Sequence, residues 1–91
     1  MTEARFDPQP SDAYAALESA GSEDLLDAID VAVDLLEEDP GDKRCRQRSF
    51  SDGLWCITVR DRSEDWLIIW ERDRDSEDLI HIRYLGADPF A

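Results

Sequence analysis

Three residues in the second half of the chain could together bind a phosphate and move a proton. Arg60 and Arg83 carry permanent positive charges, and His81 is the only histidine. Guanidinium groups can hold a phosphate and offset charge that develops on its oxygens, and an imidazole with an ordinary pKa of about 6.5 transfers protons near neutral pH. Arg60, His81 and Arg83 are therefore the candidate catalytic residues. The alternative is that they belong to the polar half of a solvated sheet face.

A second candidate site is a short basic run. It holds four bases within six residues, namely Lys43, Arg44, Arg46 and Arg48. Such a cluster could contact RNA phosphates, which makes these four the candidate nucleic-acid-binding residues. The alternative is that they pair with acidic helices or stay solvated, and exposed ion pairs contribute only about 0–1 kcal/mol each.

The signatures of several enzyme classes are absent from the sequence. It contains no GxGxxG, GxxxxGK or GxSxG motif, each of which marks a specific nucleotide-binding or hydrolase site. With one histidine and no ligand-spaced acids, we expect neither a metal nor a cofactor. Cys45 and Cys56 form no CxxC pair or disulfide framework, so we expect reduced thiols and a cytoplasmic protein. No apolar run approaches the roughly 20 residues of a membrane-spanning helix, so no membrane partner is expected.

Negative charge is concentrated in the first half. The 91-residue chain has a net charge of −13, and residues 1–42 hold thirteen acids against one base, a net charge of −12. Because affinity for nucleic acids depends on neutralising phosphates with Lys and Arg, general nucleic-acid binding is disfavoured. The acidic half either keeps the protein in solution or attracts a basic partner.

The first forty residues predict a tail and a pair of helices. Residues 1–10, with two prolines, are expected to form a flexible N-terminal tail, and residues 11–91 a single domain. Ser11 is predicted to cap a helix that ends at Gly21. Ser22 is predicted to cap a second helix, which the Pro-Gly pair at 40–41 stops. The apolar stripe of this second helix consists of Leu25, Ile29, Ala32 and Leu36.

After residue 50 the hydrophobic period changes from about 3.6 to 2, which predicts strands. The expected strands cover residues 47–51, 54–60, 66–72 and 78–85. The Asp52-Gly53 pair is typical of a tight hairpin turn, and we expect all neighbouring strands to be antiparallel. The fold class predicted is α+β, with an N-terminal αα-hairpin packed on one face of a three- to four-stranded antiparallel sheet.

The apolar alternation also predicts a register. Pairing Trp55 with Trp70, and Trp70 with Ile80, gathers the large apolar side chains on one face. The set expected under the helices is Trp55, Ile57, Val59, Trp66, Ile68, Trp70, Ile80, Ile82 and Tyr84. Tyr84 could otherwise serve as a catalytic hydroxyl, but this register assigns it to the core.

The opposite face of the sheet is expected to be only half polar. Its apolar members are Leu54, Leu67, Ile69 and Leu79. Sizeable exposed apolar patches usually mark interfaces, so these four are the candidate partner-binding residues.

The chain resembles the RelE/ParE toxin superfamily of toxin–antitoxin systems over residues 11–86. The resemblance is carried by LLEEDPG (35–41), KRCRQR (43–48), GLWCITVR (53–60), WLIIWE (66–71) and LIHIRYLG (79–86). In the ribosome-dependent mRNA interferases of this family, basic side chains on the sheet hold phosphate, and a His, Tyr or Glu assists proton transfer from the ribose 2′-hydroxyl. Arg60 matches the arginine that ends the strand after the glycine, and Arg83 matches the arginine of the last strand.

Two functions remain open from the sequence. The resemblance implies a RelE-like toxin-fold protein neutralised by a small antitoxin-like protein. It would be either an mRNA endoribonuclease acting at the ribosome or a catalytically degenerate relative. Leu67 stands where many members have a basic residue, and residues 86–91 lack the His-Arg and the terminal Tyr of the family. The alternative is a non-enzymatic acidic interaction or inhibitor module that binds a basic protein partner.

Overall fold

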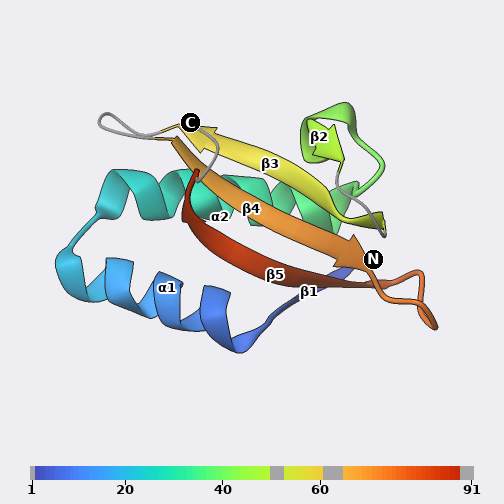
Figure 1. Cartoon of the computed structure of the whole chain (residues 1–91), viewed down its shortest axis with the longest axis horizontal. Helices are drawn as coiled ribbons and strands as arrows, with labels where there is room; N and C mark the ends of the chain where they lie inside the picture. Colours follow the sequence, from blue (N-terminus) through green and yellow to red (C-terminus); the bar gives the residue numbers. More distant parts are fainter. Residues whose placement is uncertain (1, 50–52, 61–64, 89–91) are drawn as a thin grey trace.

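The structure, a computed structural model that describes residues 2–49, 53–60 and 65–88, has two layers (Figure 1). Its elements are strand β1 (Glu3–Phe6), helices α1 (Pro8–Ala20) and α2 (Glu23–Glu38), the 3₁₀ helix η1 (Lys43–Cys45), and strands β2 (Arg48–Ser49), β3 (Trp55–Arg60), β4 (Asp65–Arg72) and β5 (Leu79–Ala87). The strand order is β1-β5-β4-β3-β2. Helix α1 packs against β5 and helix α2 against β3. The predicted α+β class is therefore confirmed, with a sheet of five strands instead of three or four.

The N-terminal residues form an edge strand, not the flexible tail predicted for residues 1–10. Strand β1 runs parallel to β5, so the sheet is mixed and not wholly antiparallel. Ala4 and Phe6 pack against the core, whereas Glu3 and Arg5 are exposed. An alternation of only four residues is too short to distinguish such a strand from a tail in the sequence.

The two helices follow the predicted pattern except at the start of α1. Helix α1 begins at Pro8, before Ser11, because the first turn of a helix does not need the N–H that proline lacks. Gly21 ends α1 as predicted, with a left-handed φ of 71°. The predicted stripe of α2 is buried, and its members are Leu25, Ile29, Ala32 and Leu36. No helix in the described ranges has both the length and the apolar character required to cross a membrane.

The predicted register between β3 and β4 is confirmed. Its apolar pairs are Trp55 with Trp70, Ile57 with Ile68, and Val59 with Trp66. Trp70 is fully buried, and its indole N–H donates a hydrogen bond of 2.7 Å to the carbonyl oxygen of Cys45. This bond fastens η1 to the middle of the sheet. The predicted turn at residues 52–53 lies partly outside the described residues.

The predicted register between β4 and β5 is wrong. Trp70 pairs with Ile82, two residues beyond the expected partner, and a β-bulge follows in which Arg83 is the extra residue of β5. A bulge reverses the faces that the following side chains occupy. Leu85 therefore enters the core and Tyr84 lies on the face away from the helices. A period of two fits registers two residues apart equally well, and the sequence carries no mark of the bulge.

Tyr84 lies close against the backbone of its own strand. Its hydroxyl donates a hydrogen bond of 3.2 Å to the carbonyl oxygen of Ala87. A Cβ atom at position 86 would come within 2.5 Å of that hydroxyl oxygen. Position 86 therefore requires glycine, because the bulge places the Tyr84 side chain directly against it.

Replacing Trp70 with alanine is expected to lower the free energy of unfolding by about 3–5 kcal/mol, because a large cavity forms in the core. The substitution also leaves the carbonyl oxygen of Cys45 without its indole partner. Urea-induced unfolding followed by circular dichroism measures the change. Trp70→Phe is the matched control, since it keeps an aromatic ring in the core and should lower the free energy of unfolding by less. A midpoint for Trp70→Ala close to that of the wild type would contradict the buried position.

Candidate functional site

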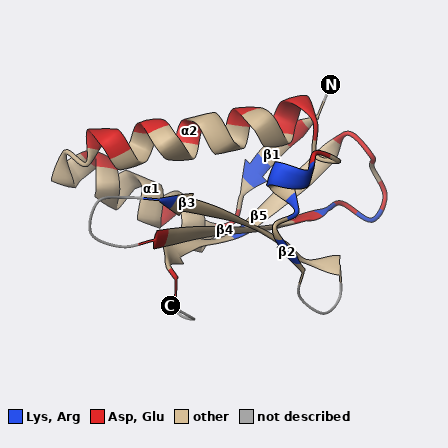
Figure 2. Cartoon of the chain, turned by 90° about the horizontal axis from the view of Figure 1, so that it is seen from above, with Lys and Arg blue, Asp and Glu red and all other residues tan. Residues whose placement is uncertain are grey.

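The helical layer presents a strongly acidic surface, with acids recurring along α2 (Figure 2). Residues 8–38, which form both helices, hold nine acids and no lysine or arginine. Asp27, Asp34 and Glu38 are exposed, and their spacing places them on one side of α2. Val31 lies on the same side and is 69 % exposed, the only large hydrophobic residue so exposed in the described part of the chain. We call these four residues the acidic side of α2.

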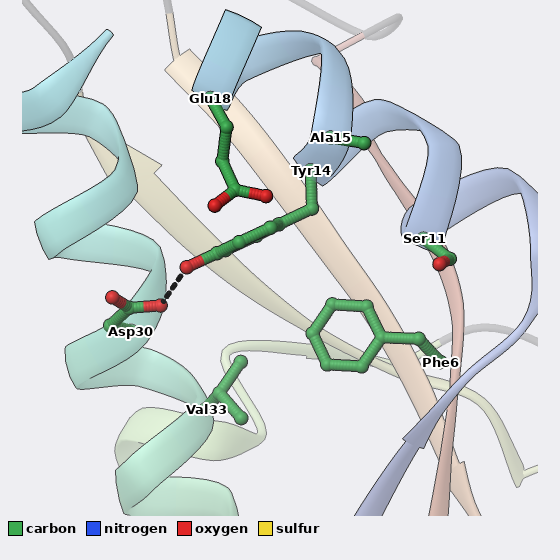
Figure 3. Close-up of a pocket in the computed structure, with 7 residues that line it drawn as sticks. All are labelled: Phe6, Ser11, Tyr14, Ala15, Glu18, Asp30 and Val33. Atoms are coloured by element: carbon green, nitrogen blue, oxygen red, sulfur yellow. Dashed lines mark hydrogen bonds between the residues drawn. The ribbon is translucent and has the colours of Figure 1, made fainter. Parts of the chain in front are cut away.

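A pocket of about 500 Å³ opens between α1 and α2 beside β1 (Figure 3). Its lining residues are Phe6, Ser11, Tyr14, Ala15, Glu18, Asp30 and Val33. The rings of Phe6 and Tyr14 meet edge to face, with centroids 6.1 Å apart and an interplanar angle of 80°. The pocket therefore has an aromatic floor and two carboxylates, and no described lining residue is basic.

One carboxylate of the pocket is held by Tyr14. The Tyr14 hydroxyl donates a hydrogen bond of 2.7 Å to Asp30 Oδ1, which joins α1 to α2. This bond, with burial and the nearby negative charges of Asp30 and Glu18, raises the pKa of Tyr14 to about 12. Tyr14 therefore remains a hydrogen-bond donor at neutral pH. Glu18 lies one helical turn further along α1, and its carboxylate has no hydrogen-bond or ion-pair partner among the described residues.

The sequence did not predict this pocket. Tyr14 and Glu18 are four residues apart, and Asp30 and Val33 three apart, so each pair shares a helix face. The packing of the two helices against each other decides which of their faces meet, and no local sequence pattern predicts that packing. Phe6 was assigned to a tail, so its ring had no predicted place in the fold.

The structure does not bring the three candidate catalytic residues into one cluster. Arg60 pairs with Asp65 at one end of β4, whereas His81 pairs with Glu71 near the other end. Asp65 and Glu71 are six residues apart, which corresponds to about 20 Å along a strand. Only His81 and Arg83 remain near each other.

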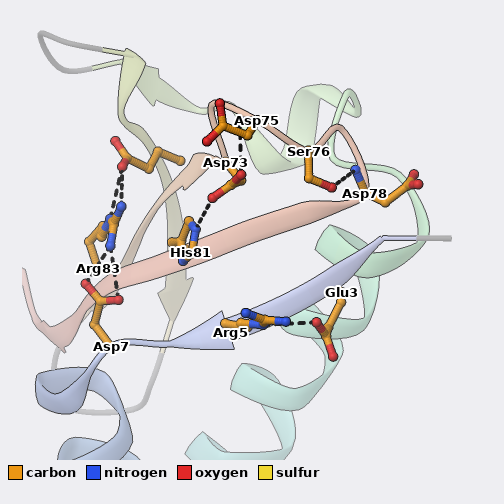
Figure 4. Close-up of polar contacts among 10 residues, drawn as sticks. Glu3, Arg5, Asp7, Asp73, Asp75, Ser76, Asp78, His81 and Arg83 are labelled. Carbon is orange, nitrogen blue, oxygen red and sulfur yellow. Dashed lines mark hydrogen bonds and ion pairs between the residues drawn. The ribbon is translucent and has the colours of Figure 1, made fainter.

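His81 and Arg83 are both bound to carboxylates (Figure 4). Arg83 Nε lies 3.1 Å from Glu71 Oε1, and Arg83 Nη1 lies 3.1 Å from each carboxylate oxygen of Asp7. The hydrogen bonds with Glu71 and Asp7 raise the pKa of Arg83. His81 Nε2 lies 2.7 Å from Asp73 Oδ1, and this hydrogen bond lowers the pKa of Asp73. A phosphate at this place would lie among three carboxylates, which repel it.

The basic run begins on η1, where Lys43 and Arg44 are exposed. Arg44 Nη2 lies 3.0 Å from Asp42 Oδ2. The hydrogen bonds from Arg44 lower the pKa of Asp42 to about 2. Asp42 directly precedes η1, so Arg44 pairs within its own loop and not with the acidic helices.

The rest of the basic run is bound near the sheet. The guanidinium of Arg46 lies 4.8 Å from the centre of the Trp55 ring, a cation–π contact, and donates a hydrogen bond of 3.1 Å to the carbonyl oxygen of Pro40. Arg48 Nη2 lies 3.2 Å from Asp88 Oδ2, and the Asp88 side chain is only 3 % exposed. Contact of Arg46 or Arg48 with RNA would compete with these interactions.

The candidate partner-binding residues are less accessible than predicted. Leu67 is fully buried within the chain itself, so it offers no surface to a partner. Leu54, Ile69 and Leu79 are half-buried. Their role in binding stays a prediction. The one large hydrophobic residue that is exposed in the described part of the chain, Val31, lies on the helical layer instead.

No protein-family model matches the chain, and neither a curated protein nor a solved structure matches it. The RelE/ParE resemblance therefore rests on the sequence segments given above and stays a prediction. Within residues 2–49, 53–60 and 65–88, no group of three or more His, Cys, Asp or Glu side chains is arranged to hold a metal ion.

Replacing Asp30 with asparagine is expected to lower the pKa of Tyr14 from about 12 towards its ordinary value of 10.0, because the charged hydrogen-bond acceptor is lost. Because the pKa of Tyr14 is higher in the folded chain than its ordinary value, protonated Tyr14 stabilises the fold. This contribution is complete below pH 10 and is lost as the pH rises to about 12. An ultraviolet absorbance titration in a Tyr84→Phe background isolates Tyr14. Asp34→Asn removes the same charge outside the pocket and should leave the titration nearly unchanged. Equal shifts in both variants would contradict the specific bond.

Proposed function

We propose that the protein is a non-enzymatic interaction module that binds a basic protein partner through the acidic side of α2. The observation that carries this proposal is the charge of the helical layer, which holds nine acids and no base between residues 8 and 38. A surface of one sign attracts partners of the opposite sign, speeds their association and repels others of its own sign.

The position of Val31 supports a protein as the partner. Its exposed side chain lies among Asp27, Asp34 and Glu38, so an apolar contact is surrounded by charges. Protein interfaces commonly combine an apolar centre with a polar rim. A basic protein that presents an apolar residue between lysines or arginines fits this arrangement.

The contacts of the chain's basic side chains also favour binding over RNA cleavage. His81, Arg83 and Arg48 each contact a carboxylate, and Arg60 lies apart from the first two. Phosphate recognition requires cations that can turn to the phosphate. We place the interaction in the cytoplasm, in agreement with the two free and buried cysteines, Cys45 and Cys56.

The proposed function predicts that neutralising the acidic side of α2 weakens binding. The triple variant Asp27→Asn, Asp34→Asn, Glu38→Gln should bind a fluorescent peptide rich in lysine and arginine about tenfold more weakly, since each exposed ion pair contributes up to about 1 kcal/mol. Fluorescence anisotropy at low and at physiological salt measures the affinity, and salt should weaken wild-type binding.

The matched control removes three charges elsewhere. Asp75, Glu77 and Asp78 are exposed in the β4–β5 connection. Their replacement by Asn, Gln and Asn changes the net charge equally and should leave the affinity within about twofold. Equal weakening in both triple variants, or no binding by the wild type, would overturn the proposal.

A second candidate function is a RelE/ParE-like toxin-fold protein, paired with an antitoxin-like protein and acting on ribosome-bound mRNA. It is favoured by the α+β architecture and by the placement of His81 and Arg83 two residues apart on one strand. In this function Arg83 would hold the scissile phosphate and His81 would shuttle the proton.

Expression without any antitoxin tests this second function. An active nuclease arrests growth and cleaves ribosome-bound mRNA, and His81→Ala should nearly abolish cleavage, because general acid–base catalysis typically contributes about 10²–10⁴-fold. Lys43→Ala, in the exposed part of the basic run, would weaken RNA binding without removing the proton-transfer group. It therefore separates a defect in RNA binding from a defect in the cleavage step. Normal growth with intact mRNA discards the nuclease.

A further inference from the structure

We propose that the pocket between α1 and α2 receives an arginine side chain of the basic partner, an assignment that rests on the function proposed above. The pocket is formed by Phe6, Tyr14 and Glu18 from the N-terminal segments and by Asp30 and Val33 from α2 (Figure 3). Its volume of about 500 Å³ lies within the range of roughly 300–1,000 Å³ that is usual for ligand pockets.

The two carboxylates provide the charge that a guanidinium requires. Asp30 is fixed by the 2.7 Å hydrogen bond from Tyr14 to Oδ1, which leaves Oδ2 available. Glu18 points to the same end of the pocket from α1, and the described chain offers its carboxylate no partner. A guanidinium has five N–H donors in one plane, so it can bond to both carboxylates at once.

The remaining lining suits the apolar stem and the flat face of the same side chain. Phe6 and Tyr14 present aromatic rings, and Val33 presents a branched aliphatic group. The methylene stem of arginine packs on such surfaces, and its guanidinium stacks on aromatic rings. The ammonium of lysine is a strongly hydrated point charge, so it gains less here. These contacts select arginine over lysine.

Binding of blocked amino acids tests the pocket independently of any partner. The probe is N-acetyl-arginine methylamide, with the lysine and citrulline analogues as comparisons. In ¹H–¹⁵N spectra of the full chain, the arginine probe should give saturable shifts centred on Phe6, Tyr14 and Val33. The lysine probe should bind more weakly, and the uncharged citrulline probe should not saturate. Equal binding of citrulline, or shifts that do not saturate, would overturn the assignment.

Paired variants separate the pocket from the general acidity of the helices. The double variant Glu18→Gln, Asp30→Asn should weaken binding of the arginine probe at least about fivefold. The amide oxygen introduced by Asp30→Asn still accepts a hydrogen bond from the Tyr14 hydroxyl, so α1 and α2 stay joined. Asp12→Asn, Glu23→Gln removes the same charge from exposed positions of the same layer, outside the pocket and outside the acidic side of α2. This control should change the affinity less than about twofold, and an equal loss in both variants would overturn the assignment.

The lysine- and arginine-rich peptide distinguishes failure of this inference from failure of the proposed function. If the peptide binds and only the variants on the acidic side of α2 weaken it, the function stands and the arginine pocket is overturned. If the pocket variants weaken the arginine-rich peptide but not an all-lysine peptide of equal charge, both are supported. If no basic peptide binds, the proposed function fails, and saturable binding of the arginine probe alone decides whether the pocket takes a guanidinium.

Discussion

One buried hydrogen bond, from the indole N–H of Trp70 to the carbonyl oxygen of Cys45, determines how the chain returns from the helices to the sheet. Trp70 is the largest fully buried side chain, and a buried carbonyl without a partner is unfavourable by about 1–3 kcal/mol. The bond holds η1 against Trp70, near the end of β4. The basic run therefore starts at a fixed place, with Arg46 over Trp55 and Arg48 in β2. A core contact thus sets the position of most of the basic run.

The two layers differ in how they balance charge. On the sheet, the bulge at Arg83 brings a guanidinium between Glu71 and Asp7, which come from separate strands and loops. The positive charge of Arg83 therefore offsets negative charge of Glu71 and Asp7 within the chain. The helical layer has acids alone, so Glu18 and the acidic side of α2 keep an unbalanced negative field. An electrostatic attraction to another molecule is therefore concentrated on the helices and in the pocket between them.

The sequence predicted the features that depend on long and uninterrupted patterns. The buried stripe of α2 and the β3–β4 register follow from sustained apolar periodicity. The β4–β5 register was missed because one bulged residue, Arg83, changes the faces without changing the apolar alternation. Strand β1 was missed because it is short, and the pocket because its lining comes from three separate elements, β1, α1 and α2. The sequence grouped Arg60 with His81 as candidate catalytic residues, but the strand geometry separates them.

Strand β1 is synthesised well before its neighbour in the sheet, β5, which spans Leu79–Ala87. During translation, the helical hairpin and the antiparallel strands can form through contacts between successive elements, whereas β1 has to wait for a strand made more than seventy residues later. Phe6 belongs to β1, so the aromatic floor of the pocket is completed only when this pairing forms. A nascent chain would therefore display the acidic helices before the pocket between them has its complete lining.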